Sequence, residues 1–148
     1  MSDTVFIPPE RRPRNGVFIP PLLIVPFVIY NVAVFLFMGG SGAGWNGQLL
    51  SIPMMSGQSW AMTSGDLLLI VGLGCLFFEV LKSTNTGRSS VIEHMLSMLV
   101  FVAFLVEFLL VSGAATSVFF ILMMMAIFDV VAGFTVSITS AGRDVTMS

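Results

Sequence analysis

Four long apolar stretches, separated by short polar segments, make up most of the chain. They cover residues 17–38, 66–81, 91–111 and 116–138. An α-helix needs about 20 consecutive apolar residues to cross a bilayer, a length that the second stretch reaches only if residues 62–66 join it. The pattern predicts an all-α integral membrane protein with four transmembrane helices.

The polar segments are predicted to be connections and tails. They are a proline-rich arm at 1–16, a loop at 39–65, turns at 82–90 and 112–115, and a tail at 139–148. The second turn is so short that the third and fourth helices should be antiparallel neighbours. Pro26 lies inside the first apolar stretch, where it removes a backbone donor, so we expect a kink there.

The positions of the basic residues predict the orientation of these helices. All six lie in the predicted arm, the 82–90 turn or the tail: Arg11, Arg12, Arg14, Lys82, Arg88 and Arg143. Short cytoplasmic loops are enriched in Lys and Arg, so both termini should be cytoplasmic, in a bacterial inner membrane. A cleaved signal peptide is the alternative for the first stretch, but its apolar run exceeds the roughly 7–15 residues of a signal core.

The loop at 39–65 has an unusual composition for a water-exposed connection. It is rich in glycine, has no charged residue before Asp66, and contains Trp45 and Trp60. Tryptophan is enriched at membrane–water interfaces, so we expect both rings to be interfacial anchors. The loop would then be a lid or a shallow re-entrant turn on the outer face.

Composition narrows the possible chemistry. Apolar residues make up 56% of the chain and charged residues 9%, and the net charge of −2 gives no reason to expect a nucleic acid partner. The single cysteine, Cys75, excludes an internal disulfide and a cysteine metal cage, and the single histidine, His94, cannot supply a haem ligand pair. We expect His94 to be a solvated residue at a helix end. No cofactor is predicted, and no catalytic motif identifies an enzyme.

Three polar residues inside the apolar stretches are the candidate functional residues: Asn31, Glu107 and Asp129. A central Asp costs about 2.5–3.5 kcal/mol to insert, so each acid must be neutral, hydrogen-bonded or paired. At 1.5 Å per residue, Glu107 should lie roughly 24 Å and Asp129 roughly 14 Å above the inner ends of their helices. The two acids should therefore not touch, with Asn31 between or beside them.

Three roles for the acids are compatible with the sequence. Each acid can be a hydrogen-bond donor that fixes helix register, a docking residue for a cation on another chain, or a station on a proton path. Small residues on the predicted fourth helix share a face with Asp129, which indicates that it points into a helix interface. Glu79 and Lys82 are three residues apart at the inner end of the second helix, where they should pair.

Two stretches resemble small uncharacterised four-span bacterial inner-membrane proteins: VEFLLVSGAATSVFF at 106–120 and DVVAGF at 129–134. The resemblance implies a membrane location and a compact four-helix form, and it transfers no site residue. We expect a non-enzymatic accessory or assembly subunit of a larger membrane complex, with other membrane subunits or a second copy as partners. The alternative is a small oligomeric channel or proton-coupled transporter that uses Glu107 and Asp129.

Overall fold

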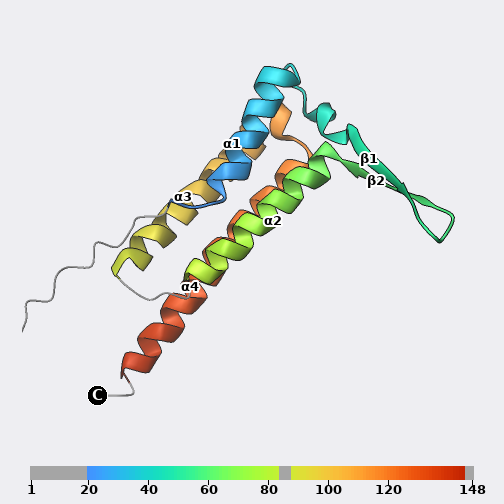
Figure 1. Cartoon of the computed structure of the whole chain (residues 1–148). Helices are drawn as coiled ribbons and strands as arrows, with labels where there is room; N and C mark the ends of the chain where they lie inside the picture. The colour runs from blue at the N-terminus through green and yellow to red at the C-terminus, as the bar shows by residue number, and fades with distance from the viewer. Residues whose placement is uncertain (1–19, 84–87, 146–148) are drawn as a thin grey trace, which may run out of the picture.

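The computed structural model describes residues 20–83 and 88–145, which form a helical bundle with a β-hairpin at one end (Figure 1). The predicted arm at 1–16, with Arg11, Arg12 and Arg14, lies outside the described residues. The elements are α1 (Ile24–Val32) with a π-helical turn (Ala33–Phe37), a 3₁₀ turn (Gly42–Asn46), β1 (Gln48–Pro53), β2 (Ser59–Thr63), α2 (Ser64–Ser83), α3 (Arg88–Leu110), a 3₁₀ turn (Ser112–Ala114) and α4 (Ser117–Val145).

Three segments in the described part of the chain are long and apolar enough to cross a membrane. They are Ser64–Ser83, Ile92–Leu110 and Ser117–Val136. The apolar helix at Ile24–Phe37 is shorter than a full span. The prediction of long apolar helices is therefore confirmed for three of the four, and the first predicted span is a shorter helix than its apolar run suggests.

The N-terminus of α1 corrects the expected position of the first helix. The helix begins at Ile24, after Pro20 and Pro21, rather than at residues 17–21. Pro26 consequently lies in the first turn, where a helix does not need its backbone donor, and the reason for a kink at Pro26 is removed. The irregular part of this helix is instead its far end, the π-helical turn Ala33–Phe37.

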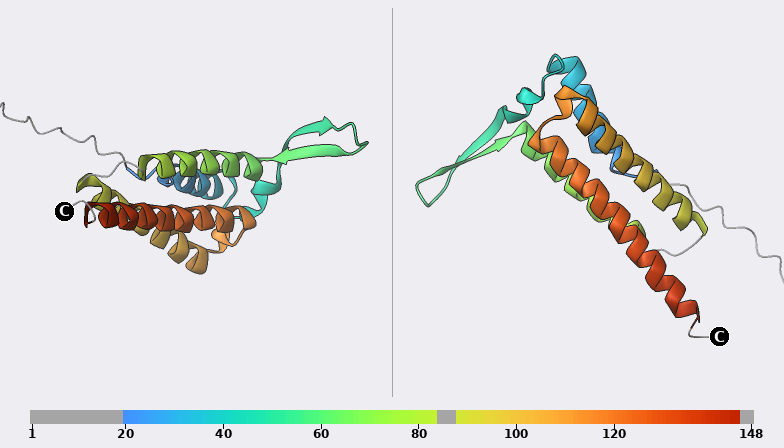
Figure 2. Two further views of the ribbon diagram at one scale, coloured as in Figure 1. Left: turned by 90° about the horizontal axis from the view of Figure 1, so that it is seen from below. Right: turned by 180° about the vertical axis from the view of Figure 1, so that it is seen from behind.

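The helices are arranged around α4, which packs against both α2 and α3 (Figures 1 and 2). The tight Ser112–Ala114 turn makes α3 and α4 antiparallel neighbours, as predicted. Aromatic rings from three helices fill the centre: the Phe119 centroid lies 4.7 Å from Tyr30 and 5.2 Å from Phe104, and Phe27 lies 4.7 Å from Phe104. Phe104 and Phe119 are completely buried, so this cluster joins α1, α3 and α4.

The segment that we expected to be a lid or re-entrant turn forms a β-hairpin instead. Strands β1 and β2 pair antiparallel, with Ile52 opposite Trp60. The tip turns at Gly57, whose positive φ of 83° favours glycine. The hairpin projects sideways from the end of the bundle where α2 begins, so it does not cover the helices (Figures 1 and 2).

Candidate functional site

One polar cluster lies between three helices at the end of α2 that is distant from the hairpin. Its members come from α2, α3 and α4 and surround a cavity of about 10 Å³: Glu79, Lys82, Ser83, Glu93, His94, Ser97 and Asp129. A cavity of this size holds about one water molecule. We call this group the inner polar cluster.

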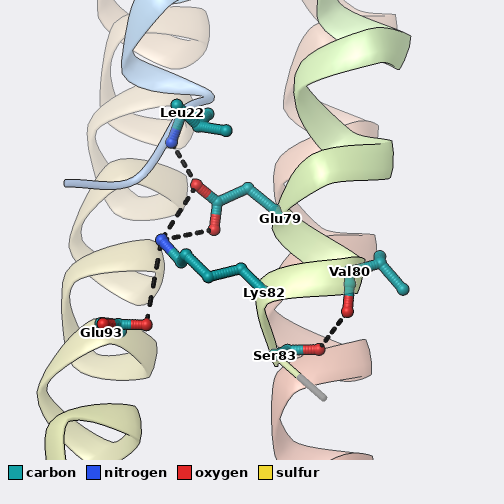
Figure 3. Close-up of polar contacts among 6 residues, drawn as sticks. All are labelled: Leu22, Glu79, Val80, Lys82, Ser83 and Glu93. Atoms are coloured by element: carbon teal, nitrogen blue, oxygen red, sulfur yellow. Dashed lines mark hydrogen bonds and ion pairs between the residues drawn. The ribbon is translucent and has the colours of Figure 1, made fainter. Parts of the chain in front are cut away.

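Glu79 contacts two other residues and is only 3% exposed. One of its carboxylate oxygens accepts a hydrogen bond from the backbone N–H of Leu22, and the other lies 3.1 Å from the Lys82 Nζ (Figure 3). The predicted Glu79–Lys82 pair is therefore present. Lys82 also lies 3.9 Å from a Glu93 oxygen, so these charges connect α2 to α3 and to the start of α1.

Asp129 completes the inner polar cluster from α4, where it is 4% exposed. Its carboxyl group lines the same small cavity as Ser97 of α3. The Oδ2 atom is buried and has no hydrogen-bond partner among the described residues. Asp129 thus points into the interface between α4 and its neighbours. The polar groups that line the cavity with it come from α2 and α3.

His94 is not the solvated helix-end residue that we expected. Its imidazole packs directly against Gly133 of α4, where a Cβ atom would lie only 2.3 Å from the His94 Nδ1. The absence of a side chain at Gly133 therefore makes room for the ring beside Asp129. This contact forms only where α3 and α4 pack together, so the sequence around either residue alone does not predict it.

Replacing Gly133 with alanine should destabilise the protein by about 1–3 kcal/mol, because the new methyl group must displace the imidazole. Gly74→Ala is the matched control, because a Cβ atom at this glycine of α2 meets nothing within 4 Å. Alanine is a better helix former than glycine, so the control should be neutral or stabilising. Thermal unfolding of both variants in detergent checks this; equal melting temperatures would contradict the packing of His94.

Asn31 and Glu107 form a second, separate polar contact, between α1 and α3. The Asn31 side-chain amide donates to the Glu107 Oε2 at 3.0 Å and to the backbone oxygen of Phe27 at 3.1 Å. The Glu107 Oε1 is buried and has no hydrogen-bond partner among the described residues. Of the three candidate polar residues, the structure brings together Asn31 and Glu107, while Asp129 belongs to the inner polar cluster.

An apolar groove between α1 and α3 lies on the same helix faces as this contact. It has a volume of about 380 Å³ and is lined by four residues from each side: Pro21, Ile24, Phe27 and Val28, with Leu96, Leu99, Val100 and Ala103. Residues three and four apart share a helix face, so Asn31 continues one wall and Glu107 continues the other. The groove therefore leads to the polar pair. We call it the α1–α3 groove.

The two tryptophans have different environments, which corrects one of the two predicted anchors. Trp45 is only 5% exposed and stacks on Tyr30, with ring centroids 5.0 Å apart. The Tyr30 hydroxyl in turn donates to the backbone oxygen of Gly113 at 2.7 Å. Trp45 is thus part of the core at the hairpin end, because the Gly42–Asn46 turn folds it inward; Trp60, on β2, is 46% exposed.

The remaining predicted topology signals also have structural roles or lie outside the described side chains. Lys82 pairs with Glu79 and contributes to the inner polar cluster, while the side chain of Arg88, at the start of α3, is not among those described. Within residues 20–83 and 88–145, no group of three or more His, Cys, Asp or Glu side chains is suited to hold a metal ion. Comparison with protein-family models, curated proteins and solved structures gives no match for this chain.

Proposed function

We propose that the protein is a non-enzymatic accessory or assembly subunit of a larger complex in the bacterial cytoplasmic membrane, and that it acts by helix–helix association. The observation that supports this function best is the α1–α3 groove, whose eight lining residues are all apolar. We propose this groove as the surface that receives a transmembrane helix of another subunit. Both termini would be cytoplasmic, as the basic residues indicate.

The lining of the groove suits a helix rather than a polar ligand. All eight lining residues are apolar, and Ala103 is small enough to let another backbone approach closely. Association inside a bilayer depends on packing and on interhelical hydrogen bonds, because lipid is as apolar as the helix surface.

The alternative function, ion or proton conduction through Glu107 and Asp129, requires a hydrated path. The cavity beside Asp129 has about 10 Å³, which is space for about one water molecule. The two acids also belong to separate helix contacts. These features favour association over transport, and proteoliposome flux distinguishes them: conduction requires that Glu107→Gln or Asp129→Asn reduces the flux.

A matched pair of tryptophan substitutions tests the groove. Leu99 lines it and is 62% exposed, whereas Leu109 on the same helix is 69% exposed and does not line it. Leu99→Trp should block the groove and reduce recovery of the partner about tenfold or more, since a 1.4 kcal/mol loss is already a factor of ten in affinity. Leu109→Trp should leave recovery unchanged.

The measurement is purification of the full chain in mild detergent after photo-crosslinking from position 103 in native membranes. We expect one defined crosslinked species that is lost in Leu99→Trp and retained in Leu109→Trp. A monodisperse monomer without any crosslinked partner, or equal crosslinking in both variants, would contradict the proposed function.

A further inference from the structure

The β-hairpin is amphipathic, although its sequence has no charged residue. Antiparallel pairing places Leu50 opposite Met62 and Ile52 opposite Trp60, and alternate residues of a strand share a face. One face of the ribbon is therefore apolar. The other face carries Ser51 opposite Ala61 and Pro53 opposite Ser59, and Leu49, which is 55% exposed, lies at the irregularity in the pairing near the base.

The apolar residues of the hairpin are not covered by the bundle. Leu50, Ile52 and Trp60 are each 43–46% exposed, and Met55 at the tip is fully exposed. The base alone is attached: the backbone N–H of Ser64 donates to the oxygen of Gly47 at 2.9 Å, and its hydroxyl donates to the oxygen of Trp45 at 3.2 Å. An isolated two-stranded hairpin is at best marginally stable in water, so this ribbon needs a surface to lie on.

The position of the hairpin base identifies the level of that surface. Strand β2 ends at Thr63, and α2, which is long and apolar enough to cross a membrane, begins at the next residue, Ser64. The base therefore lies where the span meets the membrane boundary. Because the hairpin turns sideways from the direction of α2, it stays near that level along its length (Figures 1 and 2).

Backbone chemistry limits how deep the ribbon can lie. A two-stranded sheet has unpaired N–H and C=O groups along both outer edges, and open sheet edges are not found in contact with the hydrocarbon core. The apolar side chains favour the acyl chains, whereas these edges require water or lipid headgroups. The boundary between headgroups and acyl chains meets both requirements.

We infer that the β1–β2 hairpin is a membrane-surface arm that lies in the headgroup layer of the outer leaflet with Leu50, Ile52, Trp60 and Met62 toward the acyl chains. The contact uses no charge, so it needs neither anionic lipid nor low salt. Trp60 is the anchor of this arm. Because β2 continues directly into α2, the position of the arm determines how deep α2 lies in the bilayer.

Tryptophan quenching tests this position, because the chain has only two tryptophans. In a Trp45→Phe chain in phosphatidylcholine vesicles, Trp60 should lose most of its emission when lipids carry bromine near the acyl carbonyl. Trp60 should keep most of its emission when the bromine is at the end of the acyl chain or when iodide is added to the water. In the matched Trp60→Phe chain, the buried Trp45 should respond to none of these quenchers. Added salt and anionic lipid should change none of the results.

Charge insertion on each face gives the second test. In the Trp45→Phe chain, Leu50→Asp places a charge on the apolar face and should abolish shallow-bromine quenching, whereas Ser51→Asp, on the opposite face, should leave it intact. A fluorophore on a cysteine in place of Met55, in a Cys75→Ala chain, gives the same readout if Trp45→Phe does not fold. Efficient iodide quenching would overturn the inference by placing the hairpin in water. Protection from every quencher would overturn it too, by showing a protein surface over the hairpin.

Discussion

Phe119→Ala is expected to lower the free energy of unfolding by about 3–5 kcal/mol, the range for removal of a buried phenylalanine side chain. Phe119 is completely buried, and its ring contacts aromatic rings of α1 and α3. The substitution leaves a cavity that lipid cannot reach, so the dispersion contacts of the surrounding rings are lost without replacement.

Phe128 provides the matched control on the same helix. It is 56% exposed, so lipid or detergent fills the space that Phe128→Ala leaves, and the change should be within about 0.5 kcal/mol of zero. Phe119→Leu should recover most of the loss because it refills most of the volume. Equilibrium unfolding in mixed detergent micelles measures all three variants. Equal destabilisation by Phe119→Ala and Phe128→Ala would show that the aromatic cluster is not the core.

Glu79→Leu is the second large effect that we expect, at about 3–5 kcal/mol, because it breaks a buried ion pair and leaves Lys82 with the more distant carboxylate of Glu93, at 3.9 Å. The substitution removes the 3.1 Å contact to Lys82 and the acceptor of the Leu22 N–H. The start of α1 should therefore become more dynamic, which amide hydrogen exchange at Leu22 reports.

A double-mutant cycle separates pairing from packing at this site. The double variant Glu79→Leu with Lys82→Met removes both charges, so it should be less destabilised than the sum of the single variants, by about 0.5–3 kcal/mol. Strict additivity in unfolding measurements would mean that the two side chains act independently and that Glu79 mainly serves the Leu22 amide.

The long helices were predictable because hydropathy is a local property of the chain. The runs that contain Leu68, Phe104 and Leu122 indicate apolar helices without any knowledge of their neighbours. The hairpin was missed because the glycines and the two tryptophans of residues 39–65 suggested an irregular loop at the membrane interface. A usable signal was present in the alternation Ser59, Trp60, Ala61, Met62, which has the period of a strand.

The contacts of the polar residues were less predictable, because each depends on how far one helix is shifted along another. Depths counted along separate helices could place Asn31 only between or beside the two acids. In the structure, α1 begins at the level of Glu79, one turn above the end of α2, because Glu79 binds the Leu22 amide. This shift moves Asn31 toward Glu107. The meeting of Asp129 with Ser97 likewise depends on the packing of α3 against α4.

The aromatic contacts of the core also determine when the chain can complete its fold during synthesis. Phe27 of α1 packs on Phe104 and Phe119, residues that the ribosome adds much later. Until α3 and α4 have been made, Phe27 lacks the rings of Phe104 and Phe119, and the Asn31 amide lacks its contact to Glu107. The first helix can therefore complete its packing only after the last helix has been made. A chain that stops before Ser117 lacks Phe119 and cannot form the aromatic core.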